Sequence, residues 1–542
     1  MKSVSTKKNY DLIVIGSGMG GLATASILAQ YKKQKVLLLE SHWTAGGFLH
    51  SFKRKGHEWD PGFHYIGDMS EGTQTRGCMD LVTAGRVQWQ QLHEDFEHFM
   101  FPDRTFVMPS TREAHIERLK EEFPLESDNI DAYFDDISRI HKWHYRWYYS
   151  KLWAGVVADV ISGGKDRKLA ETITADYLKE RFTDPLLIAV LTAQWGDFGT
   201  PPERSAFGVH ARVVSEFLDG GYYAIGGSQK IADTVSDIVK ENGGDVLVSH
   251  PVKEILIRDN KAYGVRVETR KETKEFYAPK IVSAAGLDTT FNRLVPGQYA
   301  QVERDRLKSA VRGMSATILF MGIKDDPRKF GFKDTNYWMY DRLEHSYEDA
   351  TVSFPPSIGN TTLSFASLRN PALKKHVAQL VTFSWYDDWK RFADKPWKKR
   401  GPEYEKLKEQ YIENLLDFVE ERIPGLRDII TYRELSTPVT VETMSGHVNG
   451  QVYGRECSPL RIKDKWSIQT SVKNLYLTGT DIVIPGVNSG LMSGVMTAAK
   501  LMPPLGVPRL LYMASKSKGQ ATVSEERPLD GALPHAPNEQ LG

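Results

Sequence analysis

The N-terminal part of the chain alternates short apolar runs with a longer segment of helical periodicity. Residues 12–15 read LIVI, a continuous apolar run typical of a buried parallel strand. Residues 21–33 place leucine, isoleucine and alanine mostly at helical spacing, and residues 35–40, KVLLLE, return to a strand pattern. The pattern therefore predicts a strand, a helix and a second strand, which is the β-α-β unit of a parallel sheet.

Four glycines stand between the first predicted strand and the helix. Gly16, Gly18 and Gly21 match the spacing G-x-G-x-x-G, and Glu40 closes the second predicted strand. In dinucleotide-binding folds the first glycine permits a tight turn, the second lets the backbone approach a pyrophosphate, and the third allows the helix to pack closely on the strand. The acid hydrogen-bonds a ribose. We therefore predict a dinucleotide site formed by Gly16, Gly18, Gly20, Gly21 and Glu40.

A second glycine pair, Gly46 and Gly47, follows in residues 41–67, SHWTAGGFLHSFKRKGHEWDPGFHYIG. A fold that binds only NAD does not need this pair. The segment resembles the flavoprotein superfamily of phytoene desaturases, carotenoid isomerases, retinol saturases and amine oxidases, in which the first motif extends to a Gly-Gly pair beside the flavin. Within it, GGFLHSF followed by HEWDPGFHYIG looks most like the retinol saturase and carotenoid isomerase branch. Amine oxidases usually carry an arginine immediately after the glycine pair, and Phe48 at that position argues against their branch. The resemblance implies FAD, held in part by Gly46, Gly47 and His50.

Three later stretches extend the resemblance over nearly the whole chain. Residues 199–233 look like the family's approach to a Tyr-x-x-Gly-Gly turn, and residues 446–454 resemble its late substrate-domain turn. Residues 473–502, KNLYLTGTDIVIPGVNSGLMSGVMTAAKLM, are the most specific of the three. In the family this motif supplies an acid to the cofactor and a helix N-terminus to the flavin ring, where free N–H groups favour an anionic reduced flavin. The implied cofactor-binding set also includes Val252, Gly286, Gly479, Asp481, Gly486, Val487 and Ser489.

These patterns and the resemblance predict an α/β fold class. We expect a Rossmann-type FAD-binding domain of the glutathione reductase kind, with an inserted α+β substrate domain and a helical membrane-facing segment. The expected FAD-binding domain takes residues 1–85, 221–290 and 466–505, and the expected substrate domain takes residues 86–220 and 291–465. Residues 506–542 are expected to form a largely disordered C-terminal tail, because the last part is polar and rich in proline and glycine.

Composition limits the remaining possibilities. A chain of 542 residues with 41% hydrophobic content can bury a large core, and a formal net charge of +1 gives no electrostatic reason to expect a nucleic acid partner. Cys78 and Cys457 are too few for a disulfide framework or a cysteine-rich zinc site. So few cysteines suit a reducing compartment, so we expect a cytoplasmic protein. The 15 histidines are scattered without HExxH spacing, so we expect no metal. The basic N-terminus predicts neither a signal peptide nor a membrane span.

Residues 141–164, HKWHYRWYYSKLWAGVVADVISGG, combine aromatic, basic and apolar residues. This composition fits an interfacial helix that lies in the plane of a membrane, and it fits an aromatic helix buried in the core equally well. The resemblance to families that take up lipid-soluble polyenes favours the interfacial helix, so we expect peripheral membrane association. Residues 506–518, GVPRLLYMASKSK, are a second candidate contact.

Three residues are candidates for proton transfer. His64 and Tyr65 follow the strand after the Gly-Gly pair, and His210 lies in a stretch that the saturase branch also matches. A histidine can donate or shuttle protons near neutral pH, although a structural role fits each residue equally well. The resemblance implies that the flavin N5 carries the hydride and that the protein orients the substrate.

Two classes of function remain. The first is an FAD-dependent oxidoreductase that saturates, desaturates or isomerises a hydrophobic carotenoid-like or retinoid-like polyene, with an unsaturated fatty-acyl lipid as the alternative substrate. The second is a non-catalytic lipid or prenyl carrier, because escort proteins for prenylated GTPases resemble the same fold without using flavin. The flavin motifs at both ends of the chain favour the enzyme. A second dinucleotide motif is missing from the sequence, so the electron partner remains open among a quinone, oxygen and NAD(P)H.

Overall fold

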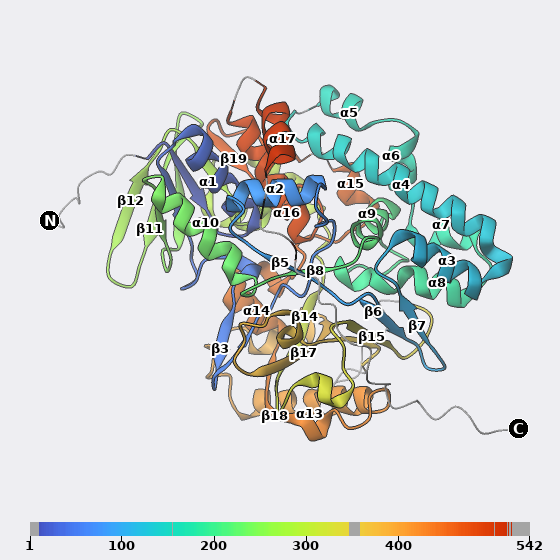
Figure 1. The fold of residues 1–542 in the computed structure, drawn as a ribbon. Helices are drawn as coiled ribbons and strands as arrows, with labels where there is room; N and C mark the ends of the chain where they lie inside the picture. The colour runs from blue at the N-terminus through green and yellow to red at the C-terminus, as the bar shows by residue number, and fades with distance from the viewer. Residues whose placement is uncertain are drawn as a thin grey trace, which may run out of the picture.

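The computed structural model describes residues 10–522 except residues 154, 346–357, 465, 503–504, 518 and 520–521. Two large sheets organise this part of the chain, one with five strands and one with seven. Figure 1 shows the five-stranded sheet with its helices in the upper part of the molecule and the seven-stranded sheet in the lower part.

The five-stranded sheet is entirely parallel. Its strand order is β19 (Leu475–Leu477), β13 (Ile281–Ser283), β1 (Leu12–Ile15), β2 (Val36–Leu39) and β9 (Asp245–Leu247). Strands β1 and β2 are buried at every position, as their continuous apolar runs predict. The order turns back beside β1, and in open α/β sheets ligands bind at the carboxyl ends of the strands at such a point. The predicted Rossmann-type fold is confirmed.

Helices α1 (Met19–Lys32) and α16 (Val487–Lys500) pack against each other through small residues. A Cβ at Gly494 would lie 2.5 Å from the Gly20 carbonyl oxygen, so these backbones meet more closely than side chains allow. Helices α2 (Gln74–Thr83) and α10 (Gln229–Glu241) also pack on α1. Helix α1 is buried from Met19 to Ala29 on all sides, which is the environment of a core helix rather than of a surface helix.

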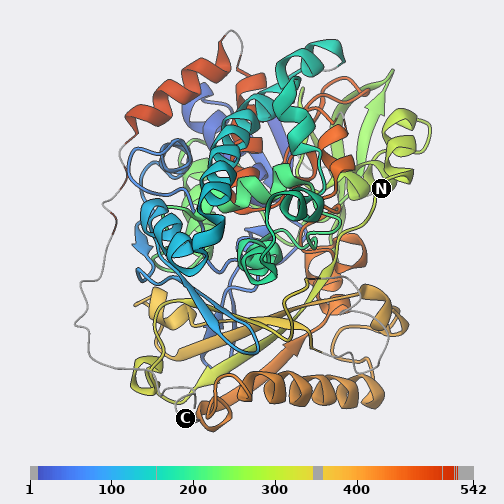
Figure 2. The same ribbon diagram turned by 90° about the vertical axis from the view of Figure 1, so that its right-hand side faces the viewer.

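The seven-stranded sheet is antiparallel except where β15 meets β6. Its order is β18 (Ile430–Ser436), β14 (Ser315–Ile323), β17 (His376–Ser384), β16 (Asn360–Ser364), β15 (Asn336–Tyr340), β6 (Glu97–Met100) and β7 (Thr105–Met108). Helix α13 (Pro402–Glu420) lies below this sheet in Figure 2. Its side chains at helical spacing, Leu407, Tyr411, Leu415 and Val419, are buried in a core shared with the sheet.

A layer of helices occupies the right-hand side of Figure 1. It consists of α3 (Arg112–Glu122), α4 (Ser127–Ser150), α5 (Val156–Ser162), α6 (Lys165–Ala170), α7 (Thr174–Arg181), α8 (Pro185–Thr192) and α9 (Phe207–Phe217). The other helices are α11 (Gln301–Lys308), α12 (Ala366–Arg369), α14 (Pro438–Ser445), α15 (Pro459–Lys463) and α17 (Gly506–Lys516). The remaining strands are β3 (Phe52–Arg54), β4 (His57–Trp59), β5 (Trp89–Gln91), β8 (Tyr222–Ala224), β10 (Val252–Arg258), β11 (Lys261–Glu268) and β12 (Thr273–Tyr277).

The parallel sheet draws its strands from three separate parts of the chain, residues 12–39, 245–283 and 475–477. The seven-stranded sheet draws its strands from residues 97–108 and 315–436. The chain therefore passes between the two sheets more than once, while the exact domain boundaries remain a prediction.

The aromatic stretch expected to face a membrane is largely part of the core. Trp143 is 0% exposed and Trp147 is 2% exposed, and the Trp143 Nε1 donates a hydrogen bond of 2.8 Å to the Ser162 carbonyl oxygen. Helix α4 directs these rings toward other helices, where burial of aromatic surface stabilises the fold. The expectation of a membrane-facing helix was wrong for these two tryptophans. Among the described large hydrophobic side chains of this stretch, Trp153, at 43%, and the valines of α5 are exposed.

The expected disordered tail begins with a helix. Residues 506–516 form α17, which packs on α2 and α16 and buries Leu510 completely. The expectation of disorder was wrong for this segment, because Gly506, Leu510 and Ala514 are spaced four residues apart and form one buried face of the helix. Residues 523–542 lie outside the described residues. Among the described helices, none is both long enough and apolar enough to cross a membrane.

We expect Trp143→Ala to lower the free energy of unfolding by about 3 to 5 kcal/mol, the usual cost of removing a buried aromatic side chain. The matched control is Trp153→Ala, which should change it by less than about 0.5 kcal/mol because the ring is exposed. Urea unfolding followed by circular dichroism measures both variants. Equal effects of the two substitutions would contradict the burial of Trp143 in the core.

Candidate active site

The first three glycines of the motif have the geometry that a dinucleotide requires. Gly16 has a φ of +92°, and a Cβ at Gly21 would overlap the Gly16 carbonyl oxygen. A Cβ at Gly18, in contrast, would meet nothing within 4 Å. Gly18 precedes α1, whose first N–H groups receive no side-chain cap from it. An open backbone at a helix N-terminus fits the approach of a pyrophosphate.

The Gly-Gly pair lies directly against this loop. A Cβ at Gly47 would lie 3.0 Å from the Gly18 Cα atom, and the Gly46 N–H donates a hydrogen bond of 2.8 Å to the Ser17 hydroxyl. The His50 Nδ1 lies 2.6 Å from the Gly47 carbonyl oxygen and closes the turn. The structure thus brings together the two glycine motifs that the sequence analysis assigned to one cofactor.

Glu40 is 7% exposed and already has four protein donors. One carboxylate oxygen accepts from the Ser17 N–H at 3.0 Å and the Ser17 hydroxyl at 2.6 Å, and the other accepts from the His42 N–H at 2.8 Å and the Ser41 hydroxyl at 3.1 Å. These donors fill the acceptor sites of a carboxylate. A ribose hydroxyl would therefore replace a serine hydroxyl, which can rotate away.

The backbone just before Val252 is hydrogen-bonded to the backbone of Glu40. The His250 N–H donates to the Glu40 carbonyl oxygen at 2.8 Å, and Val252 begins strand β10 two residues later. This places Val252 beside the ribose end of the expected site.

The opposite end of the expected site is formed by the loops after β13 and β19. The Asp481 carboxylate accepts a hydrogen bond of 2.9 Å from the Leu287 N–H, and a Cβ at Gly286 would lie 3.1 Å from the same oxygen. A Cβ at Gly479 would meet nothing within 4 Å, whereas one at Gly20 would lie 2.7 Å from the Gly479 nitrogen. Asp481 also lines a hollow of about 590 Å³. The Asp481 carboxylate and Gly479 therefore each lie beside open space.

The N-terminus of α16 is free of a side-chain cap. A Cβ at Gly486 would meet nothing within 4 Å, and Val487 begins the helix. The Ser489 hydroxyl lies 3.0 Å from the Tyr148 hydroxyl of α4. Uncapped N–H groups and the partial positive charge at this end suit an anionic group on a ligand.

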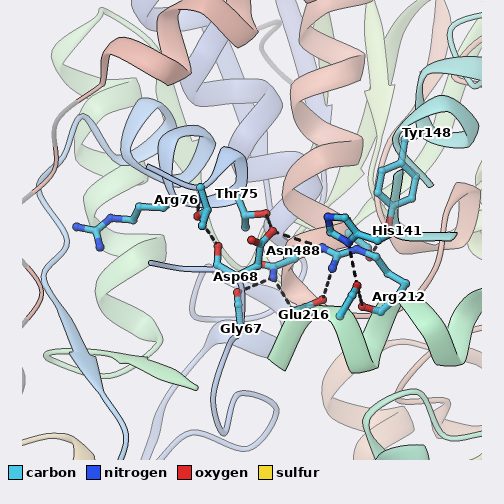
Figure 3. A network of polar contacts seen from close by, with 12 residues as sticks. Gly67, Asp68, Thr75, Arg76, His141, Tyr148, Arg212, Glu216 and Asn488 are labelled. Atoms are coloured by element: carbon cyan, nitrogen blue, oxygen red, sulfur yellow. Dashed lines mark hydrogen bonds and ion pairs between the residues drawn. The ribbon is translucent and has the colours of Figure 1, made fainter. Parts of the chain in front are cut away.

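Figure 3 shows a buried polar network that holds this helix terminus in place. The Asn488 side-chain amide donates to the Gly67 carbonyl oxygen at 2.9 Å and to the Glu216 carboxylate at 2.5 Å. Arg212, 3% exposed, lies 3.6 Å from Glu216 and 3.9 Å from Asp68. Burial raises the pKa of Glu216 to about 7, against the opposing effect of Arg212.

The sequence analysis did not identify this network. The sign of this network in the sequence is the pair Arg212 and Glu216. These two residues lie four positions apart in a largely apolar helix, where charged side chains need partners.

His64 and Tyr65 are adjacent in the chain, and their side chains make separate contacts. The His64 Nδ1 is 2.8 Å from the Gln379 side-chain amide of β17, and burial lowers the His64 pKa to about 4, so the ring is neutral at pH 7. The Tyr65 hydroxyl donates a hydrogen bond of 2.6 Å to Asp197, and the Tyr65 ring stacks on Phe217 with centroids 4.5 Å apart.

His210 occupies a different environment. It is 3% exposed, its Nε2 lies 2.8 Å from the Tyr133 hydroxyl, and burial lowers its pKa to about 3. None of its hydrogen-bond or ring contacts in the described part of the chain involves His64 or Tyr65. The structure therefore does not bring the three candidate residues together.

Two buried carboxyl groups next to Tyr65 escaped the sequence analysis. Glu97, 0% exposed, accepts from the Asn336 side-chain amide at 3.1 Å and from the Trp338 indole N–H. Burial raises the pKa of Glu97 to about 8 and that of Asp197 to about 7. The only sequence sign was a glutamate within an aromatic strand, FEHFMF at residues 96–101.

The fold and this site define an oxidoreductase with a Rossmann-type dinucleotide-binding domain. Residues 14–80 match the family described as an NAD(P)-binding Rossmann-like domain. All-trans-retinol 13,14-reductase from Danio rerio is 31% identical over 529 residues, which cover 91% of this chain and 86% of that protein. The chain therefore belongs to the all-trans-retinol 13,14-reductase family.

Three further proteins are similar to this chain, two in sequence and one in fold. A Danio rerio protein called inactive all-trans-retinol 13,14-reductase is 28% identical over 91% of this chain and 86% of its own length. Prolycopene isomerase from Arabidopsis thaliana is 26% identical over 92% of this chain and 83% of its own length. A double mutant of putrescine oxidase, from a study of cofactor binding, shares the fold with a TM-score of 0.63 at 11% identity, over 91% of this chain and 99% of that one.

We expect Gly18→Val to weaken dinucleotide binding at least about tenfold, because the new side chain would fill the space open to the pyrophosphate. Gly297→Val is the matched control, since a Cβ at Gly297 also meets nothing within 4 Å and lies outside the site. Fluorescence titration of the apoprotein with FAD measures both affinities, and circular dichroism checks the fold. Equal affinities would contradict the assignment of Gly18.

Proposed function

We propose that this protein is an FAD-dependent oxidoreductase that acts on C=C or CH–CH bonds of a hydrophobic polyene of the retinoid or carotenoid class. The observation that carries the proposal is the contact between the two glycine motifs at Gly18 and Gly47, beside an uncapped helix terminus at Gly486. An NAD site requires the first motif only. The names of the relatives, a retinol reductase and a prolycopene isomerase, support the substrate class.

The residues present fit FAD along its whole length. Glu40 and the backbone before Val252 would hold the adenosine ribose, and Gly16, Gly18, Gly20 and Gly21 with the N-terminus of α1 would hold the pyrophosphate. The remaining contacts would come from Gly46, Gly47, His50, Gly286, Gly479, Asp481, Gly486, Val487 and Ser489. When bound, the flavin supplies a centre that accepts or donates a hydride.

Aromatic side chains next to Tyr65 offer an apolar wall for a conjugated chain. The Phe383 ring lies 5.2 Å from that of Trp195 and 6.4 Å from that of Tyr453. Tyr453 and Phe383 both lie next to Gly199, two residues after Asp197. Apolar walls with a few polar groups are typical of sites for lipophilic ligands, and they exclude water from a reacting hydride.

For proton transfer we favour His64 and Tyr65 over His210. His64 and Tyr65 follow the Gly-Gly segment and each keeps part of its surface accessible, whereas His210 is enclosed by Tyr133 and Phe207. Burial keeps His64 neutral, so it can orient a substrate or exchange a proton without carrying a charge.

The proposal is tested with the FAD-loaded protein reduced under argon by dithionite. Retinoids, carotenoids and unsaturated fatty acids are added separately, and the products are analysed by liquid chromatography and mass spectrometry. We expect a polyene either to gain two hydrogen atoms or to change its double-bond geometry at constant mass. His64→Phe should slow the reaction by about 10² or more, the scale of a lost acid or base, and His210→Phe should not.

A protein that shows no flavin absorption after incubation with FAD, yet binds polyenes, would contradict the proposal and favour a lipid or prenyl carrier. If the protein converts the unsaturated fatty acids and none of the polyenes, its substrate class is a fatty-acyl lipid and not a polyene. The electron partner is identified separately, by asking whether NAD(P)H, a quinone or oxygen exchanges electrons with the bound flavin.

We also propose that the protein is cytoplasmic and binds peripherally to the surface of a membrane. Helix α5 exposes Val156 at 77% and Val160 at 74%, and the segment of α17 exposes Leu505 at 75% and Tyr512 at 66%. Both helices lie at the top of the molecule in Figures 1 and 2. Exposed apolar side chains on one end of a protein are typical of a membrane contact.

We expect the double variant Val156→Asp, Val160→Asp to lose most of its binding to liposomes, because membrane affinity follows buried apolar area. Val302→Asp is the control, since Val302 is 57% exposed on a separate helix, α11. Flotation of the protein with vesicles measures binding. If the double variant floats as well as the wild type, the membrane does not contact α5.

A further inference from the structure

We propose that Glu97, Tyr65 and Asp197 form a proton-transfer triad that delivers a proton to the substrate carbon next to the one that receives the hydride. The triad rests on the proposed function, because it supplies the second hydrogen atom of a saturation. Glu97 and Asp197 are further catalytic candidates that neither the glycine motifs nor the histidines indicate.

The triad is defined by one hydroxyl group between two carboxyl groups. The Tyr65 hydroxyl donates to the Asp197 Oδ2 at 2.6 Å, and it also lies within hydrogen-bonding reach of Glu97. A phenol has one proton and can donate to only one carboxylate at a time. The second contact is therefore satisfied only when a protonated carboxyl group donates to the Tyr65 oxygen. Glu97 is in the position to do so.

The surroundings of Glu97 favour a bound proton. Its two other partners, the Asn336 amide at 3.1 Å and the Trp338 indole, are neutral donors. The nearby cation, Arg369, is held by Asp334 at 2.9 Å and by the Asn336 amide oxygen at 2.7 Å. Within the described part of the chain neither carboxyl group has a direct cationic partner, and two such buried groups share a proton because both cannot remain charged at low dielectric.

The groups that face Asp197 are also neutral or acidic. The hydroxyls of Tyr340 and Tyr453 and the carboxyl group of Glu216 are close enough to interact with it. Burial, with the nearby carboxyl groups, raises the pKa of Glu97 to about 8 and of Asp197 to about 7. The pair therefore holds a proton near neutral pH, where the reaction can use it.

The position of Tyr65 connects the triad to the reaction. On one side, a Cβ at Gly62 would lie 2.8 Å from Phe48, which directly follows the Gly-Gly pair. On the other side, the Tyr65 ring stacks on Phe217, whose neighbour Glu216 binds Asn488 in the first turn of α16. Tyr65 thus stands between the two segments assigned to the flavin ring.

Tyr65 and Asp197 are not fully enclosed by protein. Both residues keep part of their surface accessible. The aromatic side chains of Phe383 and Tyr453 lie next to Gly199, two residues after Asp197, so apolar surface lies near the triad.

The atoms and electrons of the step balance as follows. In saturation, the π bond of the substrate breaks, and a hydride with its two electrons forms a C–H bond at one carbon. That hydride would be supplied by a reduced flavin held by the two glycine motifs, and a two-electron donor would have to reduce the flavin beforehand. The other carbon takes a proton from the Tyr65 hydroxyl, and Tyr65 regains a proton from Glu97. Water then returns the proton to the carboxyl pair. Desaturation runs the same transfers in reverse.

The first test compares saturation rates of Tyr65→Phe, Glu97→Gln and Asp197→Asn with the wild type under the anaerobic conditions above. Each triad variant should saturate the polyene about 10² more slowly while binding FAD with unchanged affinity. Glu303→Gln is the control, since Glu303 is also a buried carboxylate, is bound by Ser471 and does not belong to the triad. Wild-type rates in all three triad variants would overturn the proposal.

The second test needs neither flavin nor substrate. Infrared spectra of the apoprotein at pH 7 should show carbonyl absorption from protonated buried carboxyl groups, and subtracting the spectrum of Glu97→Gln from that of the wild type should leave the carbonyl band of protonated Glu97. Because folding raises the pKa of Glu97 from 4.5 to about 8 and that of Asp197 from 3.8 to about 7, the stability they contribute is fully present below the ordinary values and is lost as the pH rises from those values to the raised ones. The thermal midpoint of the wild type should therefore fall over that range more steeply than that of Glu97→Gln.

A difference spectrum without the Glu97 carbonyl band would overturn the triad even if the enzyme saturates polyenes. A wild type that shows the band but turns over no polyene would instead overturn the proposed function, together with the catalytic role of the triad. The two failures are therefore distinguishable.

Discussion

The site depends on the close approach of backbones at glycine positions. A Cβ at Gly20 would lie 2.7 Å from the Gly479 nitrogen, and one at Gly494 would lie 2.5 Å from the Gly20 carbonyl oxygen. These contacts bring the starts of α1 and α16 to the same end of the parallel sheet. Because two uncapped helix N-termini then face one region, a dinucleotide with an anionic pyrophosphate and an electron-accepting ring can span it.

The sequence predicted the elements of the fold that are specified by residues close together in the chain. Strands β1 and β2 and the helix between them follow from apolar periodicity, and the glycine spacing predicted a dinucleotide site at the start of that helix. The tryptophans of α4 were misplaced because aromatic composition is the same for a core helix and an interfacial helix. Only the packing partner, such as the Ser162 carbonyl that accepts from Trp143, separates the two. Helix α17 was missed because its order depends on packing against α2.

The parts of the site that escaped prediction are assembled from distant segments. Glu97 lies in β6, Tyr65 follows β4, and Asp197 lies in the turn after α8. No local spacing connects these residues, so a single sequence cannot show that one hydroxyl group lies between two carboxyl groups. The same holds for Asn488 and Arg212. In each case a buried polar or ionisable side chain within apolar surroundings marks the position, and the partner appears only in three dimensions.

The most direct test of the account is an experimental structure of the protein with FAD and a non-reactive polyene analogue. We predict that the flavin ring lies between Gly47 and the first turn of α16, and that the analogue runs along Phe383 and Tyr453 with one double bond between the ring and the Tyr65 hydroxyl. A flavin ring bound elsewhere, or a polyene separated from Tyr65 by a layer of side chains, would contradict the account.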